Sequence, residues 1–356
     1  MSDKDTILVV NPGSTSTKVG AFSRDGERFA ETIRHEAFSK SWEGPLMDQI
    51  PIRVTAIDEA LRSQGVADTA FLAVAGRGGL LKPLVGGTYR VNDLMLADLR
   101  AARLGQHASN LGAFLAQEFA NRGRGAGAFI VDPVSVDEWE PVARLSGLKG
   151  LDRVCLSHAL NSRAVARRVA AQMGRDYGDL RLIVVHLGSG TSVSVHVNGR
   201  MVDVNNSMEE GPFSMDRAGG VPTMRLLDMV MSSPDIAMKR RLFGDGGVFS
   251  YLGTRDFREV LSRVAAGEDH ARLVLDAMAY QVAKEIGAMA TVLAGRCDGV
   301  VLTGGMAHEP ALVNRIRDRV AFIAPMIVMP GEDELKALAD GVFRVLDGDE
   351  IERTYT

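Results

Sequence analysis

Two segments of the chain, about half its length apart, share one pattern of apolar and small polar residues. Residues 6–19 run from an apolar stretch through a Gly/Ser/Thr turn into a second apolar stretch, and residues 181–194 repeat this order. Gly13 of the first copy matches Gly188 of the second, and the turn dipeptide at 25–26 matches the one at 198–199, with a slightly smaller offset. The pattern predicts two β-hairpins, each with a small-residue turn at one end and a tight turn at the other. Chance similarity is the alternative interpretation, and the paired turns disfavour it.

Outside these hairpins, helix and strand patterns alternate along the chain, which predicts mixed α/β sheets covered by helices. Apolar residues in 3/4 spacing predict helices at residues 50–65, 109–122 and 270–296 and from residue 335 onward. Short apolar runs predict strands at residues 70–75, 128–131, 299–303 and 326–329.

The composition predicts a folded protein with two domains. A chain of 356 residues is longer than one hydrophobic core usually organises, and 46% apolar residues exclude disorder. No apolar run approaches the length of a membrane span, and residues 1–5 lack the pattern of a secretory signal, so we expect a cytoplasmic protein without a membrane span. The net charge of -4 provides no positive field for nucleic acid.

The two small-residue turns and a third, glycine-rich turn at 303–306 are candidate contacts for a nucleotide. A Gly/Ser/Thr turn at the end of a strand exposes N–H groups and hydroxyls to phosphate oxygens, and Lys18 adds positive charge. One such turn is a weak signal. Three together suggest two phosphate hairpins facing each other across a cleft, with a separate turn against a nucleoside. The chain has neither a Walker A nor a Rossmann fingerprint, so P-loop and dinucleotide-binding proteins lose their main support.

This three-part arrangement resembles the superfamily of acetate and sugar kinases, heat-shock chaperones and actin. Asn-Pro-Gly-Ser-Thr-Ser-Thr-Lys at 11–18 and His-Leu-Gly-Ser-Gly at 186–190 are similar to the opening and second phosphate motifs of the acetokinase family. Further segments resemble the butyrate kinases of that family, and the resemblance covers nearly the whole chain. These segments are residues 76–80, 86–91, 107–112, 158–161, 216–222 and 330–335.

The resemblance implies an α/β protein of two similar ribonuclease H-like (actin-like ATPase) domains with an ATP cleft between them. The N-terminal acetokinase domain would comprise residues 1–152 plus 335–356, and the C-terminal acetokinase domain residues 153–334. The resemblance also implies a homodimer or a higher homo-oligomer.

The implied reaction is the reversible transfer of a phosphoryl group from ATP to a short-chain carboxylic acid, giving an acyl phosphate and ADP. The acid is already ionised at neutral pH and needs no general base, whereas its repulsion from the triphosphate calls for cations. The resemblance places Arg77 and Arg217 at that point, His158 beside the reacting groups and Asp132 beside the cations. A sugar or polyol kinase with Asp132 as base, and a non-enzymatic nucleotide switch similar to actin, are the alternatives.

The other candidate residues also follow from the resemblance. Mg²⁺ is expected at Asn11 and at one of Glu334 and Asp333. Acetate kinases carry a valine and a phenylalanine where Gly79 and Ser157 stand here, which favours acids longer than acetate, butyrate-like with or without a branch. With His107 these two residues are the expected acyl pocket. The expected nucleotide and phosphate contacts are Asn11, Ser14, Ser16, Lys18, His186, Gly188, Ser189, Gly190, Gly304, Gly305 and Met306.

Overall fold

The computed structural model describes residues 5–38, 42, 44–66, 70–123, 127–232 and 238–356. Residues 1–4, which belong to the segment without a secretory pattern, lie outside the described residues. The chain divides into two compact units, unit 1 with Met1–Asp137 and Asp333–Thr356, and unit 2 with Glu138–Glu332. The chain therefore leaves unit 1 after residue 137 rather than 152, and it returns at residue 333. The assignment of the two units to acetokinase domains stays a prediction.

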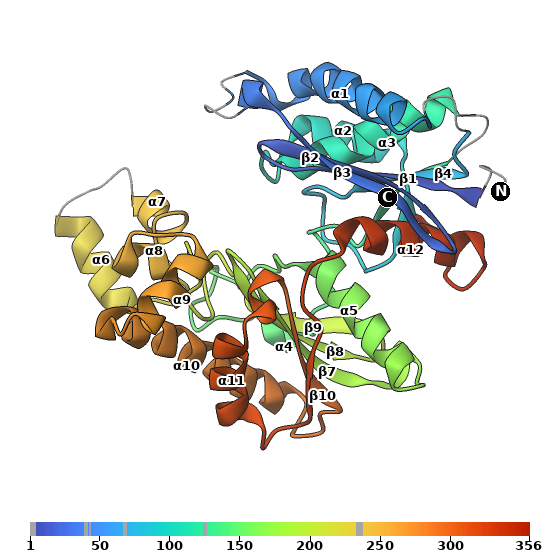
Figure 1. Cartoon of the computed structure of the whole chain (residues 1–356). Coiled ribbons are helices and arrows are strands. Elements are labelled where there is room, and N and C mark those ends of the chain that lie inside the picture. The colour runs from blue at the N-terminus through green and yellow to red at the C-terminus, as the bar shows by residue number, and fades with distance from the viewer. Residues whose placement is uncertain (1–4, 39–41, 43, 67–69, 124–126, 233–237) are drawn as a thin grey trace. The chain divides into compact units, whose positions relative to one another are not determined.

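Unit 1 is built on a mixed sheet with the order β12-β5-β6-β4-β1-β2-β3 among the described residues (Figure 1). In this sheet β1 pairs with β4, and β4 with β6, in parallel, while β1-β2-β3 is an antiparallel meander. The strands are β1 Ile7–Pro12, β2 Ser16–Ser23, β3 Gly26–Arg34, β4 Ala73–Arg77, β5 Thr88–Arg90, β6 Gly127–Val131 and β12 Arg353–Thr354.

Helices cover both faces of the unit 1 sheet. On one face α3 contacts β1 and α1 packs on α3 and β3, in one core with Leu8 and Val10 of β1, and on the other face lies α12, which contacts β1, β4 and β6. Since side chains alternate along a strand, Asn11 lies on the α12 face. The helices of this unit are η2 Glu36–Phe38, η3 Leu46–Asp48, α1 Gln49–Ser63, α2 Asp93–Ala101, η4 Ala108–Asn110, α3 Leu111–Arg122 and α12 Glu334–Leu346.

Unit 2 repeats part of this architecture, with the sheet order β11-β10-β7-β8-β9. Here β7 pairs in parallel with β10, and β7-β8-β9 is again an antiparallel meander. The strands are β7 Arg181–Leu187, β8 Thr191–Val197, β9 Arg200–Val204, β10 Gly299–Thr303 and β11 Met326–Val328.

The helix α10 covers one face of the unit 2 sheet, and α5 covers the other. Ile183 and Val185 of β7 pack with α10, whereas Leu182 and Val184 pack with α5, so His186 lies on the α5 face. The helices of this unit are α4 Pro141–Arg144, α5 Ala159–Gln172, η5 Tyr177–Asp179, α6 Thr223–Ser232, α7 Met238–Leu242, α8 Gly247–Leu252, α9 Phe257–Ala265, α10 Asp269–Val292, η6 Gly305–His308 and α11 Pro310–Val320.

The two predicted hairpins are confirmed, and their pairing explains why the sequence offset changes. Val10 pairs with Val19, whereas Val185 pairs with Val193, so the small-residue turn is one residue shorter in unit 2. The rest of the change arises at the far turn, where Asn198 and Gly199 both have positive φ but Gly26 already belongs to β3. Each second strand also carries a register shift at the equivalent place, after Ala21 and after Val195.

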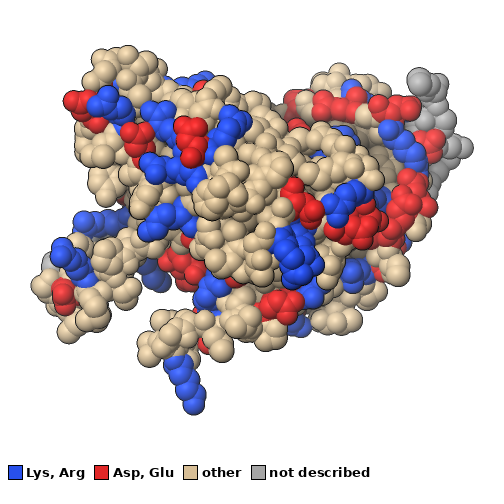
Figure 2. Space-filling view, turned by 90° about the horizontal axis from the view of Figure 1, so that it is seen from below, with Lys and Arg blue, Asp and Glu red and all other residues tan. Residues whose placement is uncertain are grey.

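The predicted mixed α/β class is confirmed. The predicted strand at 299–303 agrees with β10, while the strand predicted at 70–75 begins later and runs from Ala73 to Arg77. Within the described residues, no helix combines the length and the apolar character needed to cross a membrane. On the face that Figure 2 shows, basic and acidic side chains lie interspersed among uncharged ones.

Candidate functional site

Three predicted site residues of unit 1 lie where neighbouring parallel strands end. Asn11 is near the end of β1, Arg77 ends β4, and Asp132 follows β6. Val10 pairs with Gly76, and Arg77 pairs with Val131, so the strand ends are in register. Ligands of open α/β sheets bind at the carboxyl ends of the strands. The register therefore brings these residues to the edge where a ligand is expected.

Glu334, the first residue of α12, joins Asn11 to Arg77. Its Oε2 accepts a hydrogen bond from Asn11 Nδ2 at 2.7 Å, and its Oε1 pairs with the Arg77 guanidinium. Burial raises the pKa of Glu334, but the charge and hydrogen bond of Arg77 and the Asn11 amide outweigh burial and hold it below its usual value. Glu334 is therefore ionised and bound by a cation at neutral pH.

One N–H donor of Arg77, at Nε, has no acceptor in this cluster. Its Nε is buried and makes no hydrogen bond to any group in the described part of the chain. A buried donor without an acceptor costs about 1–3 kcal/mol, which an oxyanion ligand would recover.

Asp132 supports the backbone beside Arg77. Its Oδ1 accepts the Gly87 N–H at 2.8 Å, and its own N–H donates to the Gly87 carbonyl at 3.0 Å. The residue is 2% exposed and has a left-handed backbone with φ of 38°, which is uncommon for a residue other than glycine. One carboxylate oxygen is thus committed to the main chain.

The first small-residue turn presents Ser14 at the surface. Ser14 and Thr15 are exposed, while Ser16 and Lys18 are partly buried on β2. The Gly13 N–H donates to the Ser16 carbonyl at 2.8 Å and closes the turn.

The acyl pocket expected around Gly79 needs a correction. A Cβ built on Gly79 would lie 2.5 Å from Asn110 Oδ1 and 2.6 Å from Asn110 Cα, so Asn110 already fills the space that a valine would occupy. The absence of a side chain at Gly79 therefore leaves no extra room. His107 caps η4, with its Nδ1 accepting the Ser109 N–H at 3.2 Å, and lines a hollow of about 330 Å³ beside Ser14.

In unit 2, two predicted histidines stack on each other at the start of α5. The rings of His158 and His186 are 4.0 Å apart and inclined by 15°. Asn161 Nδ2 donates to the Glu332 carbonyl at 3.0 Å, so its Oδ1 is free to accept the Nδ1–H of His186 at 2.8 Å. This fixes a proton on Nδ1 of His186 and turns its Nε2 toward the Glu332 carboxylate, 3.6 Å away.

Arg217 lies against the second small-residue turn. A Cβ built on Gly190 would lie 2.3 Å from its Nη1, and the guanidinium stacks on Phe243 with Cζ 4.8 Å from the ring centre. It donates to Ser207 Oγ, while its buried Nε finds no acceptor among the described residues. Burial lowers the pKa of Arg217, and Asp216 offsets part of this effect. Ser189 at the tip of the turn is exposed, and its carbonyl accepts from Ser214.

The third turn packs directly on the second hairpin. Gly304 has φ of 88°, and a Cβ there would lie 2.4 Å from the Leu187 carbonyl oxygen, so only glycine fits. Gly305 is exposed, and a Cβ added to it would meet nothing within 4 Å, so the space beside the turn is open. Met306 is buried in the core with α10 and α11, so its side chain points inward.

Ser157, the second residue of the expected acyl pocket, is buried. It is 7% exposed, and its hydroxyl contacts Met201 Sδ at 3.7 Å.

The donors of unit 1 fit a hydrated magnesium ion rather than an all-protein cage. Asn11 and Glu334 offer amide and carboxylate oxygens, the ligands that Mg²⁺ prefers, and it usually keeps several waters. Asp333, the other carboxylate expected at the metal, is exposed. No group of three His, Cys, Asp or Glu side chains in the described ranges is placed to hold a metal by itself.

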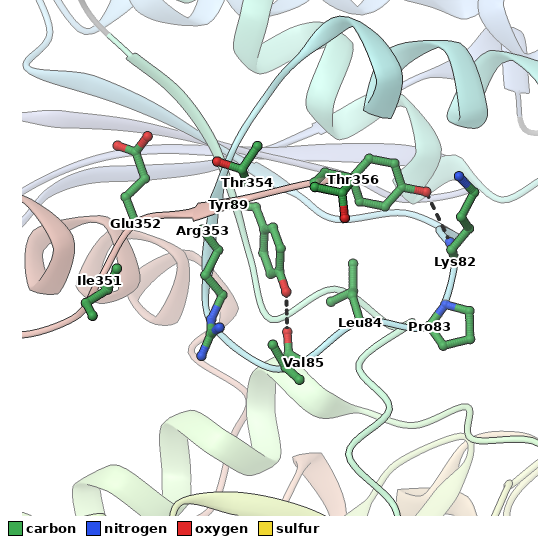
Figure 3. Close-up of a pocket in the computed structure, with 11 residues that line it drawn as sticks. Lys82, Pro83, Leu84, Val85, Tyr89, Ile351, Glu352, Arg353, Thr354 and Thr356 are labelled. Carbon is green, nitrogen blue, oxygen red and sulfur yellow. Dashed lines mark hydrogen bonds between the residues drawn. The ribbon is translucent and has the colours of Figure 1, made fainter.

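A second hollow of unit 1 holds none of the predicted site residues. It lies between residues 82–85, Tyr89 and residues 351–356, with the Tyr89 hydroxyl donating to the Val85 carbonyl (Figure 3).

The sequence analysis gave no role to three polar residues of these clusters, although two of them lie in the segments 158–161 and 330–335. Asn161 and Glu332 orient His186, and Arg53 lies under the first turn with all of its side chain buried. The burial of Arg53 could have been inferred from its position in the helix. Arg53 comes four residues before Ile57, so it lies on the same buried face of α1.

Comparison with known proteins agrees with this description. Residues 153–324 match the model of the acetokinase family. The acetate kinase of Entamoeba histolytica has a TM-score of 0.79 at 16% identity, covering 96% of this chain and 100% of its own. The acetate kinase of Porphyromonas gingivalis has a TM-score of 0.78 at 19% identity, covering 95% of this chain and 99% of its own. A propionate kinase from Francisella tularensis subsp. tularensis SCHU S4 has a TM-score of 0.78 at 16% identity, covering 96% of this chain and 99% of its own. Residues 153–324 are therefore similar to the acetokinase family, within a chain that has the two-sheet α/β fold of acetate kinases.

Proposed function

We propose that the protein is a carboxylate kinase that transfers a phosphoryl group from ATP to a short-chain, butyrate-like acid. The reaction is a reversible, direct in-line transfer that forms an acyl phosphate. One observation carries the proposal: each unit holds a candidate arginine, Arg77 and Arg217, with a buried Nε that lacks an acceptor among the described residues. The acetokinase-family match of residues 153–324 supports the same reaction.

Two arginines suit the meeting of two anions. A guanidinium neutralises charge and can hold carboxylate or phosphoryl oxygens through two parallel hydrogen bonds. An ionised acid needs no base, whereas a hydroxyl acceptor would need one.

The other candidates take the roles that the resemblance implies. Asn11 and Glu334 would help to hold the Mg²⁺ of the nucleotide, which neutralises phosphate charge when bound. The two small-residue turns would bind phosphates through Ser14, Ser16, Lys18 and residues 188–190, and Gly304 and Gly305 would lie against the adenosine. His158, which contacts Ser192 Oγ at 3.0 Å through Nδ1, would donate from Nε2 to the transferring group.

The preference for an acid longer than acetate rests on the resemblance to butyrate kinases. The size argument from Gly79 fails, since Asn110 fills that space. Ser157 supplies less support than expected because it packs on Met201.

Hydroxylamine trapping tests the reaction. The protein is incubated with ATP, Mg²⁺ and acetate, propionate, butyrate, isobutyrate or valerate, and the hydroxamate is measured. We expect product with the highest kcat/KM for butyrate or isobutyrate, and Arg217→Ala should abolish transfer while retaining much of the ATP binding. ADP release with a sugar and no hydroxamate would indicate the sugar kinase, and slow hydrolysis indifferent to acids would indicate the nucleotide switch.

The proposal includes a cytoplasmic homodimer or a higher homo-oligomer. On α6, Met224 and Met231 are exposed by 68% and 73%, which is typical of side chains that another surface covers. Light scattering of the purified protein measures the state, and a monomer at micromolar concentration would contradict it.

A further inference from the structure

A buried arginine lies beneath the first small-residue turn. Arg53, on α1, is 0% exposed, yet each of its five N–H donors has an acceptor. Nη1 donates to the Ser16 carbonyl at 2.9 Å and to Thr17 Oγ1 at 2.7 Å. Nη2 donates to the Gly13 carbonyl at 2.8 Å and to Gln49 Oε1 at 2.8 Å, and Nε donates to the same Gln49 oxygen at 3.2 Å.

The partners of Arg53 are uncharged, so its positive charge is not cancelled where it lies. Burial lowers the pKa of Arg53 to about 10, which leaves it protonated at neutral pH. The ring of Phe38 packs on the guanidinium with its centre 4.8 Å from Cζ. Burying a charge without a counter-ion costs free energy of folding. A buried, unpaired arginine is therefore a candidate for a role other than stabilising the fold.

The bonds to the turn fix the direction of a peptide plane. A trans peptide points its C=O and the following N–H in opposite directions, and the described residues contain no cis peptide bond. Because the Gly13 carbonyl points inward to Arg53, the Ser14 N–H of the same peptide points away from it. Ser14 is exposed, so this N–H and the nearby hydroxyl face outward, toward any anion at the turn.

We propose that Arg53 is a positioning residue that holds the Gly13–Ser16 turn in the shape that binds phosphoryl oxygens and adds positive potential beneath it. This inference rests on the proposed function, in which Ser14 and Ser16 contact the nucleotide phosphates. Lysine cannot replace the arginine, because an ammonium has three donors on one atom and cannot reach both turn carbonyls and Gln49 together.

The test compares the affinities for ATP and for adenosine, measured by calorimetry, in three variants. Arg53→Lys keeps the charge and loses the fork, and Thr17→Val removes one acceptor while keeping the shape, whereas Thr17→Ser restores the hydroxyl. We expect Arg53→Lys to reduce the preference for ATP over adenosine by about 10- to 100-fold, because misplacement of a binding group by an ångström has effects of that size. Thr17→Val should lose part of the preference and Thr17→Ser should retain it.

Ile57→Ala is the matched control for stability. Ile57 is also fully buried in the α1 stripe but donates nothing to the turn. It should lower the melting temperature and leave the ATP preference unchanged, and hydrogen exchange of residues 12–18 should be faster in Arg53→Lys than in this control. An unchanged ATP preference in Arg53→Lys, or an equal loss in Ile57→Ala, would overturn the inference. A wild-type protein that prefers ATP but yields no hydroxamate with any acid would instead overturn the proposed carboxylate kinase. The role of Arg53 would then still be decided by the change in ATP preference of Arg53→Lys.

Discussion

The replacement of Gly190 by alanine tests the placement of Arg217 with one added methyl group. The new Cβ would lie 2.3 Å from Nη1 and 2.5 Å from Cζ of Arg217, whereas ordinary contacts begin near 3.4 Å. The guanidinium must therefore withdraw by about 1 Å, which disturbs its contacts with Ser207 and Phe243. Gly190 is not among the residues with positive φ, so the backbone itself accepts alanine.

A displacement of this size should lower kcat/KM strongly and the free energy of unfolding only slightly. Misplacing a catalytic group by about 1 Å reduces rates by about 100-fold, so kcat/KM for the acid should fall by about that factor. The neighbour that moves is the end of a flexible side chain, so the loss of unfolding free energy should stay near the low end of overpacking, about 1 kcal/mol. Gly188→Ala brings a Cβ only to 3.0 Å from His186 Nε2 and should have a smaller effect.

Hydroxamate formation and urea unfolding of each variant give the two quantities separately. Gly287→Ala on α10 is the control, because nothing lies within 4 Å of its added Cβ and alanine favours the helix. It should keep wild-type kcat/KM and gain a few tenths of a kcal/mol or more in stability. A Gly190→Ala variant within threefold of wild-type kcat/KM would refute the role assigned to Arg217.

Three further predictions concern unit 1. Burial, and then the charge of Arg53, lower the pKa of His35 from 6.5 to about 4. Between these two pH values only the unfolded chain binds a proton at His35. The free energy of unfolding should therefore fall as the pH drops from 6.5 to 4. Urea unfolding should show that His35→Gln removes this part of the pH dependence, on the order of 3 kcal/mol. Arg77→Met and Glu334→Gln, whose side chains are 12% and 17% exposed, should show a coupling of about 1–3 kcal/mol in a double-mutant cycle of unfolding, and additive losses would contradict the pair. Removal of Mg²⁺ with a chelator should stop hydroxamate formation until Mg²⁺ is restored, and undiminished activity would exclude a magnesium role.

The sequence predicted elements best where a long apolar stripe faces one core. The helix expected at 270–296 is α10 at Asp269–Val292, and the six apolar positions that predicted it are all buried. These positions are Leu275, Met278, Val282, Ile286, Met289 and Leu293. The strand β5 has only three residues, too few to show a period, and was not predicted.

The candidate site could be predicted only as separate motifs. Local pattern marks Asn11 and Arg77 as residues in glycine-rich turns, but their link through Glu334 joins positions from opposite ends of the chain, and no local rule shows it. The reverse error occurred at Gly79, where a missing side chain suggested a pocket and tertiary packing filled the space with Asn110. Apolar periodicity also hides Arg53, because it identifies a buried stripe by residues that are themselves apolar.

The repeated hairpin explains why each unit gathers its polar residues where it does. Asn11 and His186 are equivalent positions of the two hairpins, and each points to the sheet face opposite its largest apolar core. On that face α12 begins beside Asn11, and α5 begins beside His186, so each strand end meets the N-terminus of a helix. A helix N-terminus favours anions, which suits both clusters to phosphoryl chemistry. The same position holds an asparagine bound to a carboxylate in unit 1 and a histidine stacked on a second histidine in unit 2, so the two copies of the hairpin place different chemistry at equivalent strand ends.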